Sequence, residues 1–106
     1  MDEHLPAIYQ DLRDRYPDVL AAQDHLAAAV QSSGPLDART QRLVKLGLAV
    51  GSLAEGAVRS NTRKALELGV TEQEIEQVAL LAITTRGFPA AVASWGWIRE
   101  VLEARA

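Results

Sequence analysis

Residues 65–75 read Ala-Leu-Glu-Leu-Gly-Val-Thr-Glu-Gln-Glu-Ile, and this stretch sets where one helix ends and the next begins. Gly69 suits the left-handed residue that follows a helix C-terminus, and Val70 supplies the apolar contact that accompanies it. Thr71 and Glu74 have the spacing of a capping box, in which each side chain accepts a hydrogen bond from an otherwise unpaired backbone N–H. The stretch therefore predicts two helices joined by a short connection.

Outward from this stretch, apolar residues at helical spacing alternate with helix-breaking residues. They predict helices over residues 6–16, 18–32, 37–51, 53–68, 71–86 and 89–104. Alanine is abundant while β-branched and aromatic residues are scarce, a balance that favours helix over strand. We therefore predict an all-α fold, a compact six-helix bundle, in which residues 1–106 form a single domain.

The periodicity also predicts which residues are buried and which face solvent. The expected buried stripe of the second helix is Val19, Ala22, Leu26 and Val30, and that of the fifth helix is Ile75, Val78, Leu81 and Ala82. On the third helix, Arg39, Arg42 and Lys45 recur on one face, which we expect to be solvated or to meet another subunit. Trp95 and Trp97 point about 200° apart on a helix, so one of them packs at an interface or stays partly exposed.

Composition excludes several classes of protein. The net charge is −3 with basic and acidic residues interspersed, so we expect no nucleic-acid partner. The longest nearly apolar stretch, residues 78–83, is too short to cross a membrane, and the charged N-terminus lacks the apolar run of a signal peptide, so we expect a cytoplasmic protein. There is no cysteine, and His4 and His25 lack carboxylate partners at metal-ligand spacing, so we expect no metal site.

Three blocks of sequence carry a resemblance to a known family. They are Leu36-Asp37-Ala38-Arg39-Thr40, residues 65–75, and Gly87-Phe88-Pro89-Ala90-Ala91-Val92. In order and spacing they resemble the carboxymuconolactone decarboxylase and AhpD-like superfamily, over a core of about residues 36–103. The resemblance implies a homo-oligomer, a trimer or hexamer, with an active site near the start of the central helix and no cofactor.

The peroxidase branch of this superfamily places two cysteines, a histidine and a glutamate around that site. Aligned through residues 62–65, this chain has Ala54 and Ala57 at the cysteine positions, Asn61 at the histidine and Arg42 at the glutamate. Reduction of a peroxide by that route needs a thiolate and a second, resolving thiol. The chain therefore cannot act as a thiol peroxidase.

The decarboxylase branch also lacks the cysteine pair, and it resembles this chain at Glu55 and Arg59. The resemblance implies a lyase-like activity on a small carboxylated or lactone-type molecule, with Glu55 as acid or base and Arg59 as carboxylate clamp. Asn61 would orient the substrate, because an amide cannot exchange a proton near neutral pH. The catalytic candidates are thus Glu55, Arg59 and Asn61, and the substrate-binding candidates are Ser60, Arg42 and Arg63.

A structural interpretation stands beside each of these assignments. Glu55 and Arg59 are four residues apart and can pair as a solvated ion pair, and Arg63 can pair with Glu67 in the same way. The alternative function is therefore a catalytically silent, oligomeric binding or scaffold protein that retains the fold.

Overall fold

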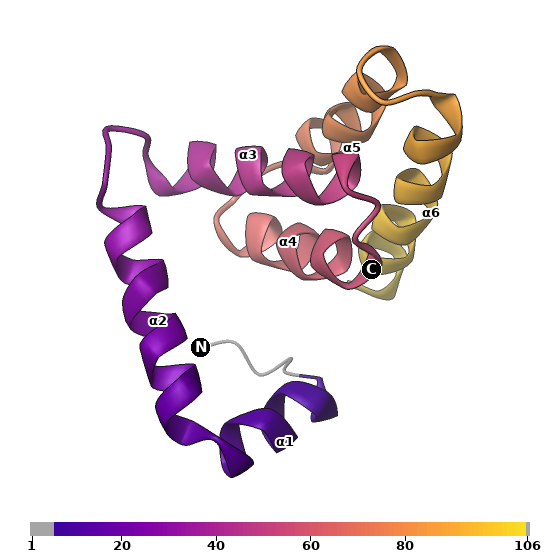
Figure 1. Ribbon diagram of the computed structural model, residues 1–106. Coiled ribbons are helices and arrows are strands. Elements are labelled where there is room, and N and C mark those ends of the chain that lie inside the picture. Colours follow the sequence, from indigo (N-terminus) through magenta and orange to yellow (C-terminus); the bar gives the residue numbers. More distant parts are fainter. Residues whose placement is uncertain (1–5, 106) are drawn as a thin grey trace. The chain divides into compact units, whose positions relative to one another are not determined.

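The computed structural model describes residues 6–105, and Figure 1 shows its helices in chain order. They are α1 (Ala7–Arg15), α2 (Pro17–Gln31), α3 (Ala38–Gly51), α4 (Glu55–Glu67), α5 (Glu72–Leu81), the short 3₁₀ helix η1 (Ala82–Thr84) and α6 (Phe88–Arg105). The residues that the structure describes contain no strand, so the all-α prediction is confirmed. None of these helices is long and apolar enough to span a membrane.

The chain divides into two compact units, Met1–Pro35 and Leu36–Ala106. The N-terminal unit holds α1 and α2, and the C-terminal unit holds the remaining helices. The boundary falls at the predicted breaker cluster Ser32-Ser33-Gly34-Pro35.

The predicted buried stripe of α2 is wrong for the single chain. Val19, Leu26 and Val30 are 58%, 57% and 54% exposed, Ala22 is exposed too, and neither α1 nor α2 contains a buried residue. Two short helices have no second layer to pack against within their own unit, so their apolar residues find no interior. The amphipathic pattern was read correctly, but it does not say what covers the apolar side.

The C-terminal unit has a dry core to which all four of its long helices contribute. Leu46 of α3, Val58 of α4, Ile75 of α5 and Ile98 of α6 are fully buried. Buried alanines on the same helices let the backbones approach closely. This core holds α3 against α4 and α5, and it thereby fixes the positions of the side chains discussed below.

The connections follow the predicted chemistry. Gly69 and Gly87 have φ of +81° and +115°, which only glycine adopts readily. Both hydrogen bonds of the Thr71–Glu74 capping box are present, and the Asp37 carboxylate accepts a hydrogen bond from the Thr40 N–H at 2.8 Å. Leu53, with φ of +54°, is a left-handed non-glycine residue in the connection between α3 and α4, and no sequence signal marked it.

The fifth helix is shorter than predicted, and one of its core residues was misassigned. It ends at Leu81, and the chain continues as η1. Leu81 is 58% exposed, and Ala79 is buried instead, because Ile75, Ala79 and Ala82 lie on one side of the helical path while Leu81 points away. Of the two tryptophans, Trp97 packs against the core and Trp95 is 36% exposed.

Candidate functional site

The first polar cluster lies between α3 and α4. Arg42 of α3 donates from Nη1 to Oδ1 of Asn61 on α4 at 2.6 Å. The amide of Asn61 is itself held, because its Nδ2 donates to the carbonyl of Ala57 at 2.9 Å. The two residues come from helices packed on the shared core, so the core sets their separation. The structure therefore brings together two of the six predicted site residues.

The guanidinium of Arg42 is only partly satisfied. Its residue is half-buried, its Nε is a buried atom with no hydrogen-bond partner, and within residues 6–105 it forms no ion pair. Buried polar groups in proteins are nearly always hydrogen-bonded, and an unsatisfied charged donor is costly. The basic row predicted on α3 is thus not simply a solvated face, since Arg42 turns toward Asn61.

The second polar cluster lies between α4 and α6, and here the arginine is satisfied. Arg59 pairs with Glu55 through Nη1 and with Glu100 of α6 through Nη2, the latter at 2.9 Å. Two hydrogen bonds raise the pKa of Arg59 above its usual value: the one to Glu55 contributes most, and the one to Glu100 contributes next. The side chains of the two glutamates are 54% and 62% exposed, so this is a surface ion-pair triad.

The three predicted catalytic residues do not point to one place. Arg59 reaches α6 and Asn61 reaches α3, because residues two apart on a helix project about 200° from each other. Ser60 and Arg63 are half-buried and make no side-chain hydrogen bond in the part of the chain described, and Arg63 does not pair with Glu67. The helix α4 thus separates two clusters that the sequence suggested were one.

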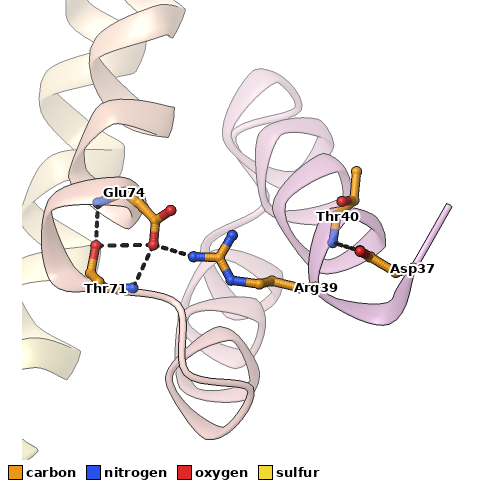
Figure 2. A network of polar contacts seen from close by, with 5 residues as sticks. All are labelled: Asp37, Arg39, Thr40, Thr71 and Glu74. Carbon is orange, nitrogen blue, oxygen red and sulfur yellow. Dashed lines mark hydrogen bonds and ion pairs between the residues drawn. The ribbon is translucent and has the colours of Figure 1, made fainter.

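A third cluster joins the start of α3 to the start of α5, and Figure 2 shows its contacts. Arg39 pairs with Glu74, whose carboxylate also accepts from the N–H and the hydroxyl of Thr71 at 2.9 and 3.0 Å. Arg39, and after it the Thr71 N–H, lower the pKa of Glu74 to about 2. Its Oε1 ties the start of α5 to Arg39 of α3, so we interpret this carboxylate as a structural anchor.

An apolar groove runs between α3 and α5, with a volume of about 560 Å³. The sequence did not predict this groove, because helical periodicity placed Leu81 in the core, whereas it is exposed. The signal was present as apolar residues in excess of one buried stripe on α3 and α5. Among residues 6–105, no three histidine, aspartate or glutamate side chains gather in a way that could hold a metal ion, and His4 lies outside that range.

The comparisons with known proteins agree with this all-α architecture. The sequence matches the model of the carboxymuconolactone decarboxylase family over residues 17–100, and the chain belongs to that family. Two uncharacterized proteins of Methanocaldococcus jannaschii are 31% identical to it. One, MJ0742, matches over 80 residues, 74% of this chain and 77% of its own, and the other, MJ1511, over 102 residues, 95% of each.

A solved structure has the same fold. The crystal structure of apo-lpg0406, a carboxymuconolactone decarboxylase family protein from Legionella pneumophila, matches with a TM-score of 0.76 at 22% identity. The match covers 90% of this chain and 88% of the other. The fold prediction and the family resemblance are both confirmed by these matches.

Proposed function

We propose that this protein binds a small carboxylated or lactone-type molecule at the cluster of Arg42 and Asn61. The observation that carries the proposal is the unfilled side of the Arg42 guanidinium. Asn61 occupies Nη1, whereas Nε and Nη2 have no hydrogen-bond partner among the described residues. A carboxylate that reaches Nη2 forms a charge-assisted hydrogen bond there, whereas the buried Nε becomes accessible to it only if the side chain moves.

Asn61 has a defined role in this proposal. Its Nδ2 is bonded to the Ala57 carbonyl, which directs Oδ1 toward Arg42 and holds the guanidinium in one orientation. An oriented guanidinium loses less side-chain entropy when a ligand binds. Ser60 and Arg63 remain candidates for contacts to the rest of the ligand.

Catalysis is the finer part of the proposal. The lyase-like mechanism places the reacting substrate on the α6 side of α4, away from Arg42 and Asn61. There Glu55 protonates the carbanion or enolate left when carbon dioxide departs, and Arg59 stabilises the negative charge before that proton arrives. Both residues would first have to be released from their ion pair, since Arg59 is held by Glu55 and Glu100. No cofactor enters this mechanism.

The test combines binding with turnover. Small unsaturated carboxylic acids and lactones are titrated into the protein and its Arg42→Met, Asn61→Ala and Arg59→Met variants, followed by NMR, and the same compounds are screened for carbon dioxide release. We expect Arg42→Met to raise the dissociation constant at least tenfold, which corresponds to about 1.4 kcal/mol of binding free energy. Arg59→Met should change the dissociation constant by no more than about threefold. Equal affinities in all variants would refute the binding site.

The turnover arm separates an enzyme from a binding protein. If Glu55 and Arg59 act in catalysis, Glu55→Gln and Arg59→Met abolish carbon dioxide release while binding persists. Binding without turnover in the wild type would favour the second candidate, a catalytically silent binding or scaffold protein. The satisfied triad of Glu55, Arg59 and Glu100 is the observation that favours this candidate.

We also propose that the protein is a homo-oligomer, a trimer or hexamer, in the cytoplasm. The unburied apolar residues of α1 and α2 support self-association, because contiguous exposed apolar surface usually marks a protein contact. Light scattering on the wild type and on a Val19→Gln, Leu26→Gln double variant tests it. We expect an oligomer that the double variant disrupts, whereas Asp24→Asn, a control on the same helix, leaves it intact; a monomeric wild type would refute it.

A further inference from the structure

The groove between α3 and α5 is separate from the cluster of Arg42 and Asn61. Its walls come from residues 40–51 and 74–86, all within the C-terminal unit. Arg42 lies on the side of α3 that faces α4, whereas Val44 and Gly47 lie on the side that faces α5. A ligand in the groove would therefore not touch the site proposed above.

The walls of the groove are apolar. Val44 and Leu81 stand on opposite walls and are 49% and 58% exposed. Gly47 and Val78 face each other across the groove, where a Cβ added to Gly47 would lie 3.9 Å from Cγ1 of Val78, at ordinary van der Waals distance. The volume is in the range of small-molecule sites, which are mostly apolar with a few polar groups.

The two ends of the groove differ in charge. At the end where α3 and α5 begin, Glu74 is neutralised by Arg39 and held by Thr71, as Figure 2 shows. At the other end, Arg86 donates from Nε to the carbonyl of Gly51 at 3.0 Å. It forms no ion pair with any residue between 6 and 105, so its two Nη groups remain available.

This arrangement specifies the chemistry of an occupant. The apolar wall requires an elongated hydrocarbon or aromatic body, and a span of twelve helical residues gives it a length of roughly 16 to 18 Å. Arg86 is exposed and its Nη groups carry no protein partner among the described residues, so they favour an anion at this end of the groove, and a guanidinium suits a planar carboxylate. A neutral apolar molecule would leave Arg86 unused, and a dicarboxylate would place its second charge beside Glu74.

We propose that the groove between α3 and α5 binds an amphipathic monocarboxylic acid, with its carboxylate on Arg86 and its apolar body between Val44 and Leu81. This is a second ligand site, independent of the proposed function. Because Nε of Arg86 is fixed by the Gly51 carbonyl, its Nη groups are held at the end of the groove.

Two variants test the site without touching the core. Gly51 lines the groove and a Cβ there would meet nothing within 4 Å, so Gly51→Leu adds an apolar side chain beside the groove without a clash at Cβ. Arg86→Gln removes the charge and keeps a polar, though shorter, side chain. Arg42→Met is the matched control, and circular dichroism verifies that every variant keeps its helices.

The probe is decanoate, used well below its micelle concentration, and the neutral control is decanol. Methyl resonances of Val44 and Leu81 are followed by NMR. We expect saturable decanoate shifts in the wild type and in Arg42→Met, at least tenfold weaker decanoate binding in Arg86→Gln with decanol binding unchanged, and loss of both ligands in Gly51→Leu.

Four results would overturn the inference. One is the absence of saturable shifts at the groove methyls. Another is an equal affinity of the wild type and Arg86→Gln for decanoate, which would show nonspecific apolar binding. The third is a shift of the groove methyl resonances that depends on protein concentration and does not change when decanoate is added. That result would show that a second copy of the chain occupies the groove. Loss of decanoate binding in Arg42→Met would also contradict it, by showing that the two sites are one.

Discussion

Arg42 of α3 contacts α4 and Arg59 belongs to α4, but only Arg59 has its charge balanced by carboxylates of the chain. Arg59 meets two carboxylates, Glu55 and Glu100, whereas Arg42 meets a single amide oxygen and keeps a buried Nε without a partner. Arg59 was visible in the sequence because Glu55 stands four residues before it, and the same spacing lets the chain satisfy it. Donors left unfilled, and not the most conspicuous ion pair, therefore mark where a ligand is expected.

The largest predicted effect concerns the core on which both arginines depend. Leu46 of α3 is fully buried, so Leu46→Ala should lower the free energy of unfolding by about 2–5 kcal/mol, through lost burial and a residual cavity. Both clusters should lose their geometry together. Urea unfolding checks this, with Leu48→Ala as control, because Leu48 is 66% exposed and should change stability by less than about 0.5 kcal/mol. An equal loss in both variants would contradict the placement of the core.

The next effect separates the two arginines by ligand-dependent stability. A molecule that binds only the folded protein at 100 times its dissociation constant raises the free energy of unfolding by about 2.7 kcal/mol. With a carboxylate ligand identified by the titrations above, we expect most of this gain to persist in Arg59→Met and, at the same ligand concentration, to fall to about 1.4 kcal/mol or less in Arg42→Met, measured by thermal unfolding. If Arg59→Met instead lost the ligand-dependent gain in stability and Arg42→Met kept it, Arg59 would be the ligand-binding arginine.

A smaller effect concerns the ion pairs of Arg59 themselves. Because both glutamates are more than half exposed, solvent screens the triad, and Glu55→Gln should reduce the free energy of unfolding by less than about 1 kcal/mol. The reduction should shrink further in high salt. Denaturant unfolding at two salt concentrations measures it. A loss of several kcal/mol, insensitive to salt, would show that the triad is desolvated, for example by a partner subunit.

The last effect is a pH dependence at Glu74, whose Oε1 accepts hydrogen bonds from Arg39 and from the N–H and hydroxyl of Thr71. Its pKa is about 2 in the folded protein and 4.5 ordinarily, so its stabilising contribution is present above 4.5 and is lost as pH falls from 4.5 through 2. Glu74→Gln should therefore flatten the decline of stability over that interval. Acid unfolding followed by circular dichroism measures the slope, and an unchanged slope would remove Glu74 as the cause.

Sequence reasoning gave the helices and their connections well, because caps and turns are local chemistry. Gly69, Thr71 and Glu74 act within a few residues, and each behaves as predicted. Burial was less predictable, because it depends on which other helix packs against a residue. Val19 and Leu26 are exposed because their unit has no second layer of helices, and Ala79 is buried where Leu81 was expected.

The candidate site shows the same limit. The pairing of Glu55 with Arg59 is local and was foreseen, whereas Glu100 comes from 41 residues further along the chain. The sequence named Arg42 and Asn61 through a family resemblance, but their hydrogen bond depends on how α3 packs against α4. No sequence motif predicts the groove, because it forms where apolar residues of α3 and α5 remain exposed between the two helices.

The arginine Nε–H resonances test the central claim most directly, because each guanidinium gives its own signal in the NMR spectrum. A small unsaturated carboxylate is titrated into the wild-type protein, and assignments come from Arg42→Met and Arg59→Met. The structure predicts a saturable shift of the Arg42 Nε–H, with the Arg59 signal unmoved. A shift of Arg59 with Arg42 unmoved, or no shift of either at saturating carboxylate, would contradict the assignment of Arg42 as the ligand-binding group.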